Sequence, residues 1–204
     1  MITVYHVPRT RSLRVVWLME ELGEEYRIEK PGFPLPPEYL GINPAGTVPA
    51  IDDDGIRMGE SIAILQYITG RRLPQAMEFT VGPNPDPAEY AAHLHFLHYG
   101  EASLMGPLSV IFRTTKLAPE GERDNFSVRD LTTALQRRFA LLDARLEDGR
   151  QWIMGDKFTI ADISVGYALT IAQALGMDDL LSEKITAYVE RLTARPAYQR
   201  AIGK

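Results

Sequence analysis

The residue pattern changes once along this chain, across a stretch that is rich in proline and glycine. Five residues that disfavour helix lie close together there: Pro74, Gly82, Pro83, Pro85 and Pro87. Proline interrupts helices because its ring removes an N–H donor and clashes with the preceding turn, so this density indicates a linker. We therefore expect a first domain over residues 1–74, a linker over 75–87 and a second domain over 88–204.

Before the linker, strand and helix patterns alternate. Short strands are predicted at Ile2–Tyr5 and Tyr26–Ile28. Between them, the apolar spacing of Ser12–Leu22 predicts a helix, and Gly23 is a typical residue for its end. The first domain is therefore expected to be a small α/β unit.

The segment Asn43–Ser61 combines a predicted hairpin with a predicted helix start. Two short apolar runs, Val48–Ile51 and Ile56–Met58, flank an Asp-Gly pair, which is a strong hairpin signal. A helical pattern begins at Ser61, and the unpaired N–H groups at a helix N-terminus attract carboxylates. This segment therefore predicts half of a site for a small anionic, peptide-like ligand.

After the linker, almost every residue falls in a helical pattern. Long helices are predicted at Ala88–Phe112, at Phe126–Leu146 and at Thr159–Leu175, with shorter helices up to Pro196. Gly106-Pro107 predicts a kink or break in the first of these helices. The second domain is therefore expected to be all-helical.

The start of the Thr159 helix has two recognisable stabilising devices. Thr159 and Asp162 fit a capping box, with Asp in place of the usual Glu. Phe158 and Ile163 fit a hydrophobic staple around the same turn. We interpret these residues as structural rather than catalytic.

Composition excludes several classes of function. The chain has no cysteine, so it has no disulfide, no cysteine–zinc site and no protein thiol nucleophile, and any thiol must come from a ligand. A net charge of −5 argues against nucleic-acid binding, which requires clustered Lys and Arg. Neither a membrane span nor a signal peptide is indicated, so we expect a soluble, cytoplasmic protein.

The order of these parts resembles the cytosolic glutathione transferases. The resemblance covers essentially the whole chain, and the segment at 5–23 is similar to a Gtt-like branch found in fungi and bacteria. It rests on four segments: YHVPRTRSLRVVWLMEELG at 5–23, NPAGTVPAI at 43–51, MGESIAILQYI at 58–68 and GDKFTIADISV at 155–165. It implies a thioredoxin-like N-terminal domain followed by an all-α C-terminal domain.

The resemblance implies a glutathione site at Thr47, Val48, Pro49, Glu60 and Ser61. In the family this proline follows a cis peptide bond, which turns the Val48 backbone toward the cysteinyl part of glutathione. The Ser61 hydroxyl and the helix N–H groups would bind the γ-glutamyl carboxylate, and Glu60 would bind the ammonium. From the residues alone, a trans proline starting an edge strand and plain helix capping remain open.

Three arginines, Arg9, Arg11 and Arg14, lie close together in an otherwise acidic chain. One of them would reach the glycyl carboxylate of glutathione or place positive charge beside its sulfur. The family often carries Lys at the position of Thr47. In this chain one of the arginines would therefore bind the glycyl carboxylate instead. The alternative is that each is an ordinary solvated arginine.

The thiolate of glutathione needs a hydroxyl donor where the first strand meets the first helix. Lowering a thiol pKa by about two units requires roughly 2.7 kcal/mol, which one charge-assisted hydrogen bond and a helix dipole supply. The resemblance implies three candidates. Thr10 falls nearest the usual serine, Ser12 lies at the expected helix N-cap and Tyr5 matches the tyrosine classes by spacing. We rank Thr10 and Ser12 equally, with Tyr5 after them.

In the family, the first helix after the linker lines the pocket for the second substrate and the dimer interface. Five residues of this chain are candidates for an electrophile pocket: His98, Tyr99, Ser103, Met105 and Phe112. Core packing between helices is the alternative. His95, His98 and Glu101 step by three along one face, but no second ligand cluster supports a metal site, so we expect no metal.

The resemblance therefore implies a glutathione transferase that conjugates glutathione to small hydrophobic electrophiles in detoxification, and a homodimer. Glutathione is a co-substrate rather than a resident cofactor. A non-enzymatic protein that keeps the fold for glutathione, other ligands or proteins is the rival from another class. A glutathione-dependent peroxidase or reductase is the third possibility.

Overall fold

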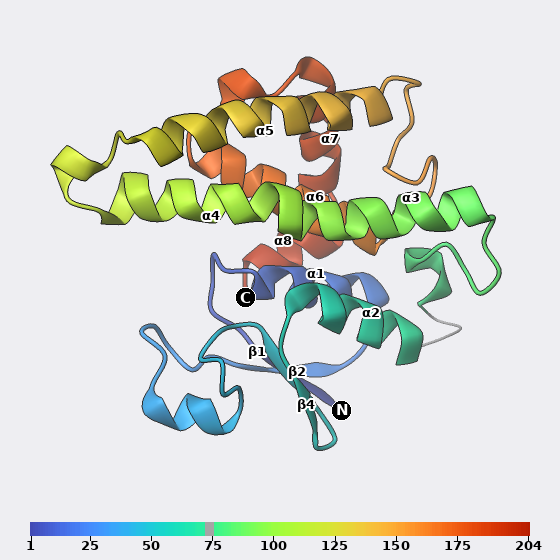
Figure 1. The fold of residues 1–204 in the computed structure, drawn as a ribbon. Helices are drawn as coiled ribbons and strands as arrows, with labels where there is room; N and C mark the ends of the chain where they lie inside the picture. The colour runs from blue at the N-terminus through green and yellow to red at the C-terminus, as the bar shows by residue number, and fades with distance from the viewer. Residues whose placement is uncertain (72–75) are drawn as a thin grey trace. The chain divides into compact units, whose positions relative to one another are not determined.

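The computed structural model of this protein describes residues 1–71 and 76–204 (Figure 1). Pro74, at the expected end of the first domain, lies outside the described residues. The chain divides into two compact units. The sheet unit comprises Met1–Pro83 together with Thr193–Lys204, and the helical unit comprises Asn84–Leu192.

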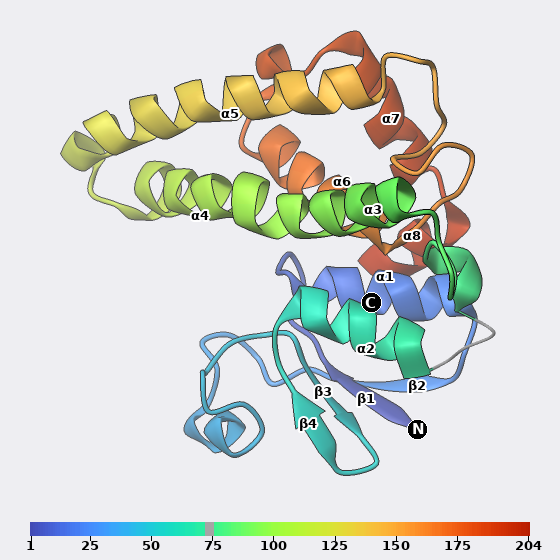
Figure 2. The same cartoon turned by 45° about the vertical axis from the view of Figure 1, so that its right-hand side comes forward.

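The sheet unit contains one mixed sheet in the order β2-β1-β3-β4 (Figure 2). Strand β2 runs parallel to β1, whereas β3 runs antiparallel to β1 and β4 antiparallel to β3. The strands are β1 Ile2–Tyr5, β2 Tyr26–Glu29, β3 Ala50–Asp53 and β4 Ile56–Met58. This topology confirms the thioredoxin-like expectation for the N-terminal part.

The β3–β4 hairpin has the turn that its sequence predicts. Asp54 and Gly55 have φ angles of 52° and 93°, and two left-handed residues in succession are typical of a type I′ turn. Strand β3 begins at Ala50, two residues later than predicted from the apolar run. Pro49 explains the shift, because it has no N–H to offer to a neighbouring strand.

Helices α1 Ser12–Leu22 and α2 Ser61–Arg71 pack on the sheet, and α8 Pro196–Ile202 packs on α1. Short 3₁₀ turns occur at Pro37–Gly41 and Met77–Phe79. Helix α8 lies on α1, where the rings of Trp17 and Tyr198 meet edge-on at 4.9 Å between centroids. Arg195 adds a two-pronged ion pair, with its Nε 2.6 Å and its Nη2 2.8 Å from the Glu21 carboxylate.

The helical unit is built around a helix that is buried along most of its length. That helix is α6, Ile160–Ala174. The others are α3 Pro87–His98, α4 Gly106–Phe112, α5 Phe126–Arg145 and α7 Glu183–Thr193. Over the residues that the structure describes, no helix combines the length and the apolar character that crossing a bilayer requires.

The predicted long helix at 88–112 is interrupted, but by more than a kink at Gly106-Pro107. A π-helical segment, Tyr99–Met105, separates α3 from α4. A methyl group on Gly100 would lie 2.5 Å from the Ser164 carbonyl carbon, so only glycine allows α6 this close. Gly106-Pro107 instead begins α4, where a proline in the first turn is tolerated.

The predicted capping box at the start of α6 is confirmed, and Asp162 does more than cap. Its buried carboxylate accepts hydrogen bonds from the Thr159 N–H, the Ile153 N–H and the Tyr188 hydroxyl, each at 2.8 Å. One side chain therefore joins the first turn of α6 to the preceding loop and to α7.

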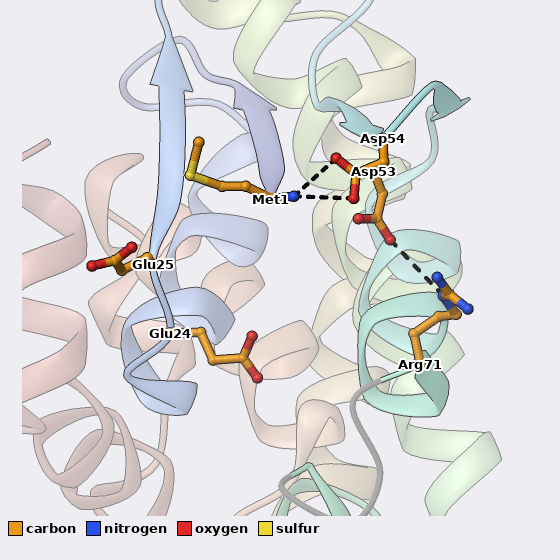
Figure 3. Close-up of a pocket in the computed structure, with 6 residues that line it drawn as sticks. All are labelled: Met1, Glu24, Glu25, Asp53, Asp54 and Arg71. Carbon is orange, nitrogen blue, oxygen red and sulfur yellow. Dashed lines mark hydrogen bonds and ion pairs between the residues drawn. The ribbon is translucent and has the colours of Figure 1, made fainter.

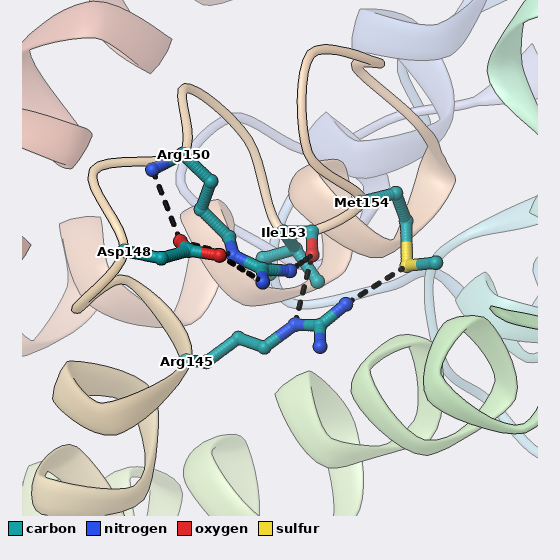
Figure 4. A network of polar contacts seen from close by, with 5 residues as sticks. All are labelled: Arg145, Asp148, Arg150, Ile153 and Met154. Atoms are coloured by element: carbon teal, nitrogen blue, oxygen red, sulfur yellow. Dashed lines mark hydrogen bonds and ion pairs between the residues drawn. The ribbon is translucent and has the colours of Figure 1, made fainter. Parts of the chain in front are cut away.

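Two arginines also bind the loop before α6, through the carbonyl oxygen of Ile153 (Figure 4). Arg145 Nε and Arg150 Nη1 both donate to the Ile153 carbonyl oxygen, at 2.9 and 3.2 Å. Arg150 also binds Asp148 through two nitrogens, and this pairing holds the pKa of the Asp148 carboxyl at about 2. The peptide groups of Ile153 are thus fixed on both sides, by Asp162 and by the two guanidinium groups.

Candidate functional site

A compact network of hydrogen bonds lies in the loop between β1 and α1. Thr10 Oγ1 is 2.7 Å from the Val7 carbonyl oxygen and 2.7 Å from Ser12 Oγ. Ser12 Oγ in turn lies 2.8 Å from His6 Nδ1 and accepts from the Val7 N–H at 3.2 Å. The two hydroxyls that the sequence ranks equally therefore touch each other.

The structure distinguishes these two hydroxyls by exposure. Ser12 is fully buried, whereas Thr10 is half-buried. The prediction that Ser12 caps the helix is wrong. Ser12 is the first residue of α1, the N-cap position is Arg11, and the Ser12 side chain turns back toward Val7 and His6. Part of Thr10 is accessible to solvent and Ser12 is not, so Thr10 is the more accessible of the two to a ligand.

His6 was not selected from the sequence, although a signal for it exists. The inward-facing residues of β1 are Ile2 and Val4, and the period of two continues to His6, which is 2% exposed. Burial, with a smaller effect of Lys30, lowers the pKa of His6 to about 4. At neutral pH the ring is therefore uncharged, with one nitrogen as donor and the other as acceptor.

Tyr5, the third candidate, is positioned differently from Thr10 and Ser12. Alternation along β1 puts its side chain on the face opposite to His6. Its half-buried ring packs edge-on against Tyr39, with centroids 5.8 Å apart and planes at 71°. The contacts of Tyr5 are thus those of a packed strand residue.

The N-terminus of α2 carries the second part of the candidate site. Ser61 is its first residue, is 3% exposed, and accepts a hydrogen bond of 3.1 Å from Arg14 Nη1. Arg14 is fully buried, so its side chain reaches Ser61 from inside the unit. Glu60 is exposed and has a left-handed φ of 64°, an uncommon backbone state for a non-glycine residue. Uncommon conformations of this kind cluster at functional sites.

The loop before β3 supplies a third part. The Val48–Pro49 peptide bond is cis, as the resemblance implied. The Thr47 carbonyl oxygen accepts from Asn43 Nδ2 at 2.7 Å and from the Tyr39 hydroxyl at 3.0 Å. These two bonds fix the backbone immediately before the cis bond, while the Thr47 side chain stays exposed.

The arginines of the β1–α1 loop occupy different environments. Arg9 is exposed and has a left-handed φ of 64°, directly before Thr10. Arg11 is half-buried at the N-cap of α1. The sequence does not distinguish Arg14 from the other two arginines. In the structure, Arg14 donates a hydrogen bond to Ser61. The roles of Arg9 and Arg11 toward glutathione stay predictions.

The five residues predicted for an electrophile pocket are divided between surface and core in the helical unit. His98 and Phe112 are exposed and Ser103 is half-buried. Tyr99 and Met105 are buried, and the Tyr99 hydroxyl donates to the Arg138 carbonyl oxygen at 2.9 Å. The pocket itself stays a prediction.

A separate cavity of about 480 Å³ opens at the start of β1, at the end of the strand away from Thr10 (Figure 3). Acidic side chains dominate it, and its lining residues are Met1, Glu24, Glu25, Asp53, Asp54 and Arg71. The Met1 ammonium and Arg71 each pair with one of its aspartates. In residues 1–71 and 76–204, no group of three or more His, Asp or Glu side chains is placed to hold a metal ion.

A buried histidine of the helical unit predicts a dependence of stability on pH. Burial, with a smaller effect of Lys157, lowers the pKa of His93 to about 4. The unfolded chain takes up this proton near pH 6.5, so the free energy of unfolding should fall as pH drops toward 4, and His93 alone should contribute about 2 kcal/mol of this fall at pH 5. Urea denaturation at pH 7.5 and 5 measures the difference. His93→Gln should reduce it, whereas the exposed His95→Gln should leave it unchanged.

Comparison with known proteins matches both parts of the chain. The model of the "Glutathione S-transferase, N-terminal domain" matches residues 10–71, and that of the "Glutathione S-transferase, C-terminal domain" matches residues 91–196. Glutathione S-transferase 3 of Schizosaccharomyces pombe is 27% identical over 222 residues, which cover 100% of this chain and 88% of the relative.

Two further relatives match along nearly their whole length. Disulfide-bond oxidoreductase YfcG of Escherichia coli (strain K12) is 27% identical, over 100% of this chain and 95% of the relative. A solved glutathione transferase of Methylococcus capsulatus str. Bath is 26% identical, with a TM-score of 0.81, over 100% of this chain and 98% of that one.

Proposed function

Since this chain belongs to the glutathione S-transferase family, we propose that it binds glutathione and uses its thiolate against small hydrophobic electrophiles. One observation carries the proposal. The half-buried Thr10 hydroxyl stands in front of a buried serine at the junction of β1 and α1, where the family chemistry requires a donor to sulfur.

We assign the binding of glutathione to the sheet unit. The γ-glutamyl carboxylate would meet the Ser61 hydroxyl and the N–H groups of the first turn of α2, and the ammonium would meet Glu60. Because Ser61 Oγ accepts from Arg14, its own proton is available to the carboxylate. The Val48 backbone would pair with the cysteinyl part of glutathione.

At the other end of the ligand, we assign the glycyl carboxylate to Arg9 or Arg11, with Thr47 beside it. Both arginines lie in the loop between β1 and α1, and Arg9 and Thr47 are exposed. Guanidinium groups bind carboxylates in a two-pronged manner, which suits a terminal carboxylate.

The chemical step requires no base from the protein. The thiol of glutathione releases its proton to solvent, and Thr10 donates a hydrogen bond to the thiolate that remains. The sulfur then forms a bond to an electrophilic carbon, and a leaving group departs with the electron pair or solvent protonates the adduct. Apolar pockets favour hydrophobic electrophiles, and His98, Ser103 and Phe112 are the accessible candidates to contact one.

A second reaction is favoured by the relative that is named a disulfide-bond oxidoreductase. In this reaction the thiolate of glutathione would attack a disulfide sulfur, form a mixed disulfide and release one thiol. A second glutathione would release the other thiol and leave as glutathione disulfide. Because the chain contains no cysteine, both reacting thiols must come from glutathione.

The binding proposal predicts that Ser61→Ala weakens glutathione binding about tenfold, which is the loss of one charge-assisted hydrogen bond. Isothermal titration with glutathione measures the change. Ser127→Ala, which alters an exposed serine of the helical unit, is the matched control and should bind like wild type.

Two outcomes separate the alternatives. Wild type that neither retains glutathione nor conjugates an electrophile would overturn the proposal. Wild type that binds glutathione but reacts with neither electrophiles nor disulfides would identify a non-enzymatic binding protein. A size-exclusion measurement on the same sample tests the homodimer that we propose from the family.

A further inference from the structure

The hydrogen bonds behind Thr10 have a definite direction, because three short contacts must share three protons. The contacts are 2.7 Å from the Val7 carbonyl oxygen to Thr10 Oγ1, 2.7 Å from Thr10 Oγ1 to Ser12 Oγ, and 2.8 Å from Ser12 Oγ to His6 Nδ1. Polar atoms this close need a proton between them. The available protons are those of the two hydroxyls and the one ring proton of a neutral histidine.

The carbonyl oxygen fixes the assignment, because it can only accept. Thr10 must donate to Val7, so Ser12 must donate to Thr10, and His6 must donate from Nδ1 to Ser12. Ser12 Oγ also lies 3.1 Å from the Val7 carbonyl oxygen. A Ser12 proton directed there would leave the shorter contact of 2.7 Å between the two hydroxyls without a proton. The Val7 N–H fills the second lone pair of Ser12 Oγ. With the ring proton on Nε2, Ser12 would have to donate to His6 and Thr10 to Ser12. Thr10 Oγ1 and the Val7 oxygen would then face each other at 2.7 Å with no proton.

We infer that His6 is a positioning residue that, as its Nδ1–H tautomer, directs this chain of hydrogen bonds so that the Thr10 proton points away from Ser12. A thiolate arriving at Thr10 can then take this proton in place of the Val7 oxygen, while Thr10 still accepts from Ser12. Hydrogen bonds in a chain polarise one another, so Thr10 becomes a stronger donor. The inference rests on the proposed function, since the thiolate is present only if glutathione binds.

The environment of His6 fits this role. The ring is 2% exposed and Ser12 is fully buried, so water does not compete for their contact. With its pKa lowered to about 4, His6 stays neutral over the range in which a thiol ionises, and its tautomer is retained throughout.

The tautomer can be measured directly in the wild-type protein. Nitrogen-15 NMR of the histidine rings distinguishes a protonated Nδ1 from a protonated Nε2, and the assignment to His6 follows from its loss in a His6 variant. We expect Nδ1–H at neutral pH, with and without glutathione. A protonated Nε2 would overturn the inference, whatever ligand the protein binds.

Two substitutions test the consequence for the thiolate. Asparagine carries an N–H donor at the same number of bonds from Cβ as Nδ1, so His6→Asn keeps the direction of the chain. His6→Leu removes the donor. The ultraviolet absorbance of the bound thiolate, followed against pH, gives the thiol pKa in each variant.

We expect His6→Leu to raise this thiol pKa by about one unit, which leaves about tenfold less thiolate at a pH below the wild-type thiol pKa. His6→Asn should resemble wild type, and at a pH below the thiol pKa both should keep the wild-type affinity for glutathione. A His6→Leu protein with the wild-type thiol pKa would overturn the inference. If His6→Leu does not fold, the NMR measurement decides. If wild type does not bind glutathione, the proposed function fails separately, and the tautomer still tests the hydrogen-bond chain.

Discussion

Asp162→Ala is expected to destabilise the helical unit by about 3–5 kcal/mol, because it leaves several buried donors without an acceptor. The carboxylate satisfies the N–H groups of Thr159 and Ile153 and the hydroxyl of Tyr188, all in the interior of the unit. A loss of this size is a large fraction of the stability of a typical domain, so the variant should be largely unfolded at physiological temperature.

Urea denaturation followed by circular dichroism measures this loss. Asp156→Ala, which removes an exposed aspartate from the loop before α6, is the control and should change the free energy of unfolding little. Asp162→Asn keeps one acceptor oxygen, so it should fall between Asp162→Ala and wild type. A loss below about 1 kcal/mol for Asp162→Ala would contradict the account, because a single cap alone contributes that much.

Thr10→Val is expected to lower the rate of conjugation about a hundredfold at a pH below the wild-type thiol pKa, since it removes the donor to sulfur without changing the shape of the side chain. If the bound thiol pKa rises by about two units, the thiolate population falls in proportion, equivalent to roughly 2.7 kcal/mol. The rate should recover at high pH, where the thiol ionises without assistance. Thr10→Ser keeps a hydroxyl and should remain active.

The pH profile of kcat/KM for wild type, Thr10→Val and Ser12→Ala measures this effect and identifies the donor. Ser12 is buried behind Thr10 and would act through it, so Ser12→Ala should cost less activity than Thr10→Val. The opposite order, in variants that fold and bind glutathione, would show that Ser12 is the donor.

Local patterns predicted much of the fold. The period of β1, the end of α1 at Gly23, the Asp54-Gly55 turn and the capping box at Thr159 each depend on interactions within a few residues. Short-range rules are sufficient for such features, so the structure agrees with them. The cis bond before Pro49 was different, because only the resemblance implied it.

Features that depend on tertiary packing were missed. The Ser12 hydroxyl looked like a cap, because the sequence does not show that His6 and Val7 compete for it. The sequence around Gly100 did not predict the π-helical segment, because this segment depends on the close approach of α6. The candidates for the electrophile pocket come from one helical pattern, and such a pattern cannot separate buried residues from exposed ones on an interrupted helix.

Helix α8 determines when the sheet unit can be completed during synthesis. The sheet unit consists of residues 1–83 and 193–204, with the whole helical unit inserted between them. During synthesis, α1 leaves the ribosome long before the residues that cover Trp17 and pair with Glu21. Domains generally form as units while the chain emerges, and late long-range contacts delay completion. The nascent protein must therefore keep its first unit unfinished, with an uncovered apolar face on α1, until residues 193–204 emerge.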